Sequence, residues 1–261
     1  MPFPDKPKVR YRKNPLDRVV CQLRFPPILK IDSGLPADFQ EQIRQEFQNF
    51  SEKTELKIEV PAKLAPPETW PQLVQPTATK NYEFSSEDGI WKINLTRSFI
   101  ALSTNQYTRW QDFRDKLSLP LQALMENYAP THFSRIGLRY IDVIKRSKFN
   151  LQNAAWKDLF QPHILGLLGA EEVANSIPSF ESQYDINLTD GQGSVRIITR
   201  FVEAKDNGEL SYMIDSDFSN STKTEHRRVL EQLDQFSMRG ARLFQWCITE
   251  KLHQAMEPEA L

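Results

Sequence analysis

The fold is decided by a strand signal in the middle of the chain, Ser134-Arg135-Ile136-Gly137-Leu138-Arg139-Tyr140-Ile141-Asp142-Val143-Ile144. Its Leu138-Arg139-Tyr140 resembles Leu23-Arg24-Phe25, which closes an alternating apolar and polar stretch near the N-terminus. Each stretch is followed by a helical pattern, several antiparallel-looking strands and a long amphipathic helix. Since the repeat lies in the order of these elements, the sequence predicts two topologically similar halves, 1–130 and 131–261, within one compact unit.

The first half is expected to hold a strand at 19–25, a helix at 37–50, a short strand at 56–60, a proline-rich surface excursion at 61–76 containing Trp70, strands at 82–84, 91–96 and 99–103, and a helix at 110–128 that Pro120 kinks. The second half is expected to hold the strand described above, helical turns at 154–168, strands at 181–189, 194–203 and 209–216, and a helix at 222–255. Asp-Gly and Asn-Gly pairs mark hairpin turns at Asp88-Gly89, Asp190-Gly191 and Asn207-Gly208.

This order of elements predicts an α+β fold in which long helices cover one face of an antiparallel sheet. It resembles the repeated unit of the TATA-binding-protein-like fold. A helix-grip or a paired ferredoxin-like arrangement is nearly as compatible. The likeness concerns architecture and carries no function.

Composition narrows the classes of protein and of partner. At 261 residues the chain buries enough apolar surface to fold without disulfides or metals. Its net charge of −1 offers no general attraction to nucleic acid or to acidic membranes. Cys21 and Cys247 lie among apolar residues, and neither a signal peptide nor a bilayer-spanning segment is present, so we expect a cytoplasmic protein without membrane association.

No catalytic or cofactor-binding motif stands out. The four histidines have no metal-binding spacing, and no phosphate-binding loop or nucleophile elbow occurs. The sequence therefore predicts neither a cofactor nor a metal, and a non-catalytic role is favoured. An enzyme built from scattered residues such as His132, Arg139 and Asp142 is the third alternative.

Strand alternation places five arginines on the sheet face opposite the apolar one: Arg24, Arg135, Arg139, Arg196 and Arg200. In a functional interpretation they bind phosphate groups, and Gly137 leaves space for an anionic or flat group. In the interpretation we favour, they pair across strands with carboxylates on a solvated face; the candidates are Glu59, Asp142, Asp185, Glu181 and Glu203.

Two binding functions follow from this face. The first is a regulatory module that holds a partner protein through the five arginines or through the segment around Trp70. The alternative is nucleic-acid or nucleotide binding, with Tyr140 and Trp91 as stacking rings, although alternation points Tyr140 inward. The apolar residues Phe244, Trp246 and Leu252 lie off the main stripe of the last helix, so a homo-oligomer contact there is a further hypothesis beside burial against the sheet.

Three motifs together resemble a sporadically distributed bacterial family of uncharacterised proteins of about this length: Asn14-Pro15-Leu16 before Val19 to Phe25, Arg135 to Ile141, and Leu230-Glu231-Gln232-Leu233-Asp234 with Phe244, Ile248 and Thr249. Asp234 departs from the family pattern, which has histidine there. The resemblance implies an accessory system such as phage defence or a toxin–antitoxin module. It implies no functional residues.

Overall fold

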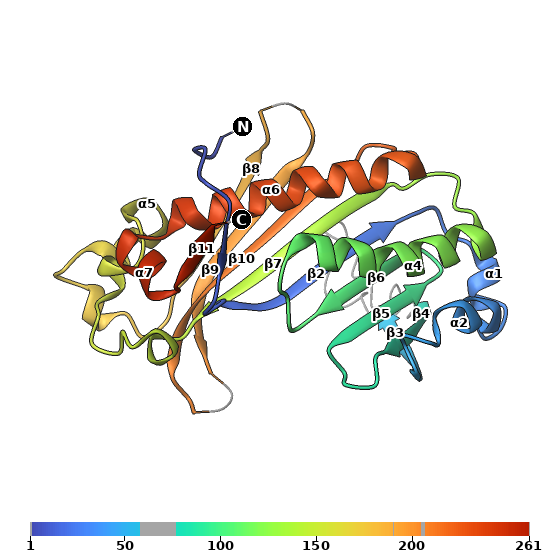
Figure 1. The fold of residues 1–261 in the computed structure, drawn as a ribbon, viewed down its shortest axis with the longest axis horizontal. Coiled ribbons are helices and arrows are strands. Elements are labelled where there is room, and N and C mark those ends of the chain that lie inside the picture. Colours follow the sequence, from blue (N-terminus) through green and yellow to red (C-terminus); the bar gives the residue numbers. More distant parts are fainter. Residues whose placement is uncertain (1, 58–76, 190, 205–206, 261) are drawn as a thin grey trace, which may run out of the picture.

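The central strand signal forms β7 (Arg135–Ile144), in the middle of a nine-stranded antiparallel sheet (Figure 1). The computed structural model describes residues 2–57, 77–189, 191–204 and 207–260. The other strands of this sheet are β2 (Leu16–Arg24), β3 (Asn49–Lys57), β4 (Thr77–Ser85), β5 (Trp91–Thr96), β6 (Phe99–Thr104), β8 (Glu181–Asn187), β9 (Ser194–Glu203) and β10 (Leu210–Asn220). The fold is therefore α+β with one large antiparallel sheet.

The two similar strands pair with each other at the centre of the sheet. Strand order is β3-β4-β5-β6-β2-β7-β10-β9-β8, so β2 and β7 join the two halves of the chain. Their register places Leu23 opposite Ile136 and Arg24 opposite Arg135. Backbone hydrogen bonds thus make the sheet continuous across both halves.

The helices pack on one face of this sheet. They are α1 (Leu29–Asp32), α2 (Ala37–Ile43), α4 (Trp110–Tyr128), α5 (Pro162–Leu165), α6 (Val229–Cys247) and α7 (Glu250–Ala255), with short 3₁₀ turns η2 (Arg146–Phe149), η3 (Trp156–Asp158), η4 (Gly166–Gly169), η5 (Ala174–Ser176) and η6 (His226–Arg228). The long helices α4 and α6 lie against the strands from the same side (Figure 1). The α4 helix continues through Pro120, which is buried.

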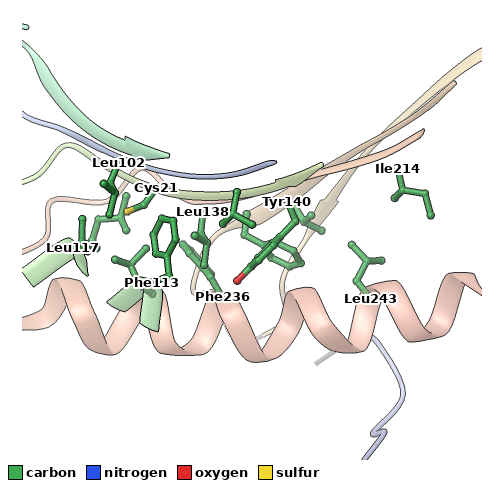
Figure 2. Close-up of a cluster of buried hydrophobic side chains, with 14 of the residues drawn as sticks. Cys21, Leu102, Phe113, Leu117, Leu138, Tyr140, Ile214, Phe236 and Leu243 are labelled. Atoms are coloured by element: carbon green, nitrogen blue, oxygen red, sulfur yellow. The ribbon is translucent and has the colours of Figure 1, made fainter. Parts of the chain in front are cut away.

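The core lies between the sheet and these two helices. Cys21, Leu138 and Tyr140 point from the strands towards Phe113 of α4 and Phe236 of α6 (Figure 2). All these side chains are at least nine-tenths buried. The predicted apolar stripe of α6, from Val229 to Cys247, is fully in this core, which confirms the 3.6-residue pattern.

Gly240 allows α6 to approach the sheet closely. A Cβ at this position would lie 2.8 Å from the Tyr140 ring, which is shorter than a normal contact. The inward direction of Tyr140 is as the sequence predicts. The Tyr140 hydroxyl is buried near Tyr107 and Ser237, and burial raises its pKa.

The N-terminal segment crosses α6 (Figure 1), and Tyr11 contacts His253 of α7. Strand β1 (Val9–Tyr11) pairs with β11 (Pro258–Ala260) in a separate two-stranded sheet. Phe3 is buried beside Trp246, with ring centroids 5.5 Å apart, and Tyr11 contacts the ring of Phe244 at 5.9 Å. The apolar residues that lie off the α6 stripe are therefore in contact with the N-terminus of the same chain.

Two expected helices differ in length from the prediction. The first ends at Ile43, and Phe50 is part of β3, where it pairs with Phe84. The short strand expected at 56–60 is the end of β3 as far as Lys57; residues 58–60 lie outside the described residues. Since strand pairing with β4 is a long-range contact, the local helical pattern does not reveal it.

The expected C-terminal helix, 222–255, is divided. It ends at Cys247, where Ile248 forms a bridge with Phe160, and α7 starts after Thr249. The Thr249 hydroxyl accepts a hydrogen bond from the Leu252 amide and caps the new helix. The bridge between Phe160 and Ile248 and the Thr249 cap thus divide the helix, although the apolar pattern continues in the sequence.

Candidate functional site

The sheet face opposite the helices, here called the open face, carries all five predicted arginines. They are Arg24 on β2, Arg135 and Arg139 on β7, and Arg196 and Arg200 on β9. Their buried strand neighbours, such as Leu23, Leu138 and Ile197, face the helices. The alternation of the strands therefore gives the predicted placement, and the packing of the described helices leaves this face uncovered.

Arg139 pairs with the most buried of the carboxylates that the five arginines contact in the described part of the chain. Its Nε donates to Oδ1 of Asp215 at 2.7 Å, and its Nη2 contacts the second carboxylate oxygen. Asp215 is only 4% exposed, whereas the Arg139 side chain is about half exposed. Hydrogen bonding to this carboxylate raises the pKa of Arg139. The arrangement is a bidentate pair in which arginine shields a buried carboxylate.

Arg135 occupies the space above Gly137. A Cβ at Gly137 would lie 2.3 Å from Nη1 of Arg135, so the guanidinium lies directly over this backbone. Nη2 donates to Asp217 at 2.8 Å and Nη1 to Gln22 at 3.4 Å. The expectation that Gly137 leaves room for a ligand is therefore wrong, because the neighbouring arginine fills that room.

The β9 arginines pair with the edge strand β8. Arg196 donates to Asp185 at 2.8 Å, and Arg200 lies 3.6 Å from the Glu181 carboxylate. All four side chains are about half exposed. The hydrogen bond from Arg196 lowers the pKa of Asp185. These two pairs are the ones that strand alternation suggested.

The other predicted partners among the described residues are not on this face. Asp142 points towards the helices, whereas Asp215 and Asp217, which the sequence analysis omitted, pair with the β7 arginines. The alternation of Asp215 and Asp217 on β10 is the signal that would have identified them. Glu59 and Trp70 lie outside the described residues, so neither is placed.

Arg24 differs from the other four arginines. Its Nε donates to Gln22 at 2.9 Å, and among the described residues no carboxylate pairs with it. It lies opposite Arg135 across the β2–β7 pair and is exposed. This end of the open face therefore has an exposed positive charge.

The two rings proposed for base stacking face the helices. Tyr140 lies against α6, and Trp91 contacts Phe113 of α4, with ring centroids 5.6 Å apart. The Lys116 ammonium lies over Trp91 at 5.7 Å. Neither Tyr140 nor Trp91 is therefore available to a ligand on the open face.

Titratable groups with strongly raised pKa lie in the core. Burial, with a smaller effect of Asp215, raises the pKa of Asp142 to about 8. Burial likewise raises the pKa of Cys247 to about 12, and that of the Tyr11 phenol, which is 2.8 Å from Nδ1 of His253. Asp142 is 5% exposed, and no hydrogen bond reaches its carboxyl within the described part of the chain. Such a group is suited to retaining a proton near neutral pH.

A polar cavity of about 500 Å³ lies elsewhere, against α6. It is bounded by residues 191–192 after β8, the end of β10, residues 222–228, and the side of α6 that carries Gln232, Gln235 and Arg239. We call it the α6 groove. Sequence reasoning did not find it, because its walls come from segments far apart in the chain. None of the groups with raised pKa described above lines it.

The part of the chain that the structure describes holds no group of three or more His, Cys, Asp or Glu side chains positioned to bind a metal ion. Among the described helices, none is both long enough and apolar enough to cross a membrane. Both cysteines are free and buried.

No family model matches this chain, and neither the curated proteins nor the solved structures include a significant match.

Proposed function

We propose that the protein is a non-catalytic binding module that holds a partner protein on the open face. The observation that carries this proposal is the sheet face that the described helices leave uncovered, with its row of cross-strand ion pairs. Arg196 and Arg200 are half exposed there, and Arg24 is exposed without a carboxylate partner among the described residues. Arginine is enriched among the residues that dominate binding energy at protein interfaces.

The pairing of charges supports a protein partner over a polyanion. A phosphate backbone that approaches Arg196 also meets Asp185, and one that approaches Arg135 meets Asp217. These carboxylates repel it and reduce the benefit of each arginine contact. A protein surface with interspersed acidic and basic side chains can bind both members of each pair. Nucleic-acid binding is therefore the alternative, with Arg24 as its best anchor.

The location of the perturbed acids supports binding over catalysis. An enzyme site combines a cavity with groups of shifted pKa. Here Asp142 and Cys247 are enclosed in the core, while the α6 groove is lined by other residues. The proposal is accordingly a binding protein, and the enzyme alternative would require the core to open.

The test is purification from the native host at endogenous level, with and without nuclease. The protein is compared with an Arg24→Glu, Arg196→Glu, Arg200→Glu variant and with a control, Lys251→Glu, which makes a single charge reversal of the same kind on α7. We expect a stoichiometric protein that survives nuclease, is lost from the triple variant and is retained by the control. The purified partner should rebind the wild-type chain with the same pattern.

Two outcomes would overturn the proposal. Material that disappears on nuclease treatment and binds with a steep salt dependence would establish the nucleic-acid alternative. A partner protein retained equally by the triple variant would show that binding uses another surface.

We also propose that the two halves of the chain are a structural duplication. Its support is that β2 and β7 are each followed by helical turns, a meander and a long helix, and that β2 pairs with β6 as β7 pairs with β10. The first meander has one strand more than the second. Superposition of β2, β4 to β6 and α4 on β7, β8 to β10 and α6 should align the helices, as in the TATA-binding-protein-like fold; crossed helices would refute it.

We further propose that the protein belongs to the sporadic bacterial family, is cytoplasmic and acts in an accessory defence system.

A homo-oligomer through the C-terminal helix is a further proposal, although Phe3 and Tyr11 already cover part of that surface. Light scattering of the full chain and of a Trp246→Ser variant tests it: a dimer that the variant abolishes supports it, and a monomeric wild type refutes it.

A further inference from the structure

The α6 groove has a composition unlike that of the core around it. Among the described residues its lining consists of glycine, amide, hydroxyl and charged side chains, with no aromatic or aliphatic residue. Its volume of about 500 Å³ is within the range of small-molecule sites, whose linings are usually mostly apolar. A ligand for this groove must therefore be recognised by hydrogen bonds and charge.

Cationic side chains predominate in the groove. Lys223, Arg227, Arg228 and Arg239 line it, against Glu225 and Glu231. Arg227 pairs with Glu225 at 2.7 Å. Lys223 and Arg228 are exposed, and among the described residues no carboxylate pairs with either. Two cationic groups are therefore available to an anion at the mouth of the groove.

The inner part of the groove is ordered by hydrogen bonds. The Asn220 amide donates to Oε1 of Gln232 at 3.3 Å, and Oδ1 of Asn220 accepts from the amide and hydroxyl of Thr222. These contacts fix the Gln232 side chain, yet its Nε2 is buried without an acceptor in the described part of the chain. A buried amide nitrogen is not accessible from the groove, so the exposed groups of the lining are the ones that contact a ligand.

We infer that the α6 groove binds a small phosphorylated sugar, whose phosphate contacts Lys223 and Arg228 and whose hydroxyl groups contact the amides and carboxylates of the groove. Ammonium and guanidinium groups are the usual partners of phosphate oxygens. The Gln235 amide supplies a donor and an acceptor, and the Glu231 carboxylate supplies acceptors, for sugar hydroxyls. Since no ring or aliphatic side chain of the described residues lines the groove, a nucleobase would gain little there. This site is separate from the open face and does not depend on the function proposed above.

The test is isothermal titration of the full-length protein with ribose 5-phosphate, ribose, inorganic phosphate and AMP, each to about 10 mM. We expect saturable binding of ribose 5-phosphate, at least about tenfold tighter than ribose or phosphate alone. AMP should bind no more tightly than ribose 5-phosphate. A Lys223→Gln, Arg228→Gln variant should weaken binding at least about tenfold, whereas Arg196→Gln on the open face should leave it unchanged.

The charge-preserving variant Lys223→Arg, Arg228→Lys should retain binding, which separates charge recognition from a folding defect. Absence of saturable binding of ribose 5-phosphate, or equal binding by the charge-removing variant, would overturn the inference. Phosphate binding as tightly as the sugar phosphate would refute the sugar contacts, and a strong preference for AMP would refute the ligand class.

Discussion

Replacement of Asp142 by asparagine should stabilise the protein increasingly as the pH rises. Asp142 lies on β7 between Leu16 and Ile214, points into the core and is 5% exposed. Burial is the largest cause of its raised pKa, and the nearby Asp215 carboxylate adds to it. Asparagine has nearly the same shape as the protonated acid but cannot ionise, so the variant removes the titration and preserves the packing.

The magnitude follows from linkage. The pKa of Asp142 is about 8 in the folded chain and 3.8 in its ordinary state. Between these values the unfolded chain releases the proton and the folded chain keeps it, so the free energy of unfolding decreases by about 1.4 kcal/mol per pH unit. The contribution of Asp142 to the free energy of unfolding is therefore largest below about pH 4, and at pH 7 it is lower by roughly 4 kcal/mol.

The assay is urea unfolding at about pH 5.5, 7 and 8.5, followed by tryptophan fluorescence. The difference in free energy of unfolding between Asp142→Asn and wild type should grow with pH and level off above about pH 8. The control is Asp185→Asn, an exposed aspartate of the same sheet whose pKa Arg196 lowers; it should show no such growth. A constant difference at every pH, or a variant less stable than wild type at pH 8.5, would refute the reasoning.

Substitutions at three further positions test the packing and one contact between α4 and α6. Gly240→Ala places a methyl group 2.8 Å from the Tyr140 ring. The clash, about 1–3 kcal/mol, should exceed the gain of about 0.5–1 kcal/mol in helix propensity, so the variant should be less stable than the wild type. A higher urea midpoint would contradict this. Gly193→Ala is expected to destabilise by about 3 kcal/mol or more, because a Cβ would lie 2.1 Å from the Ser219 carbonyl oxygen at a φ of +115°; an unchanged Tm would show that the turn can relax. Asp234 accepts hydrogen bonds from Trp110 and Arg114 of α4, at 2.7 and 3.1 Å. Asp234→Ala should lower the free energy of unfolding in urea by about 1 kcal/mol, and Asp234→Asn should lower it by less. If both variants were as stable as the wild type, this contact would contribute nothing.

Much of the fold could be predicted because strand and helix patterns are local. Val19, Cys21 and Leu23 are buried as their alternation predicts, and the α6 stripe faces the sheet as its spacing predicts. The boundaries were less predictable where a distant strand competes with local propensity. Phe50 belongs to β3 because it pairs with β4, and nothing within residues 37–50 indicates that pairing.

The sequence predicted the sheet face on which the arginines lie, but not the carboxylates with which the β7 arginines pair. Alternation placed Arg135 and Arg139 on the open face, and the structure has them there. Their carboxylates come from β10, and which strand lies beside β7 is a property of the sheet order. The α6 groove is a stronger example, because residues 191–192 and Arg239 meet only in the folded chain.

The sequence by itself determined which residues of each strand and helix are apolar, and hence the inward direction of Tyr140 and the outward direction of the arginines, because these periodicities depend only on backbone geometry. The tertiary structure alone decided the neighbours. The Arg135 guanidinium covers Gly137, the N-terminal Phe3 covers Trp246, and Asp142 is enclosed in the core. Each of these depends on chain segments brought together from distant positions, which local patterns do not specify.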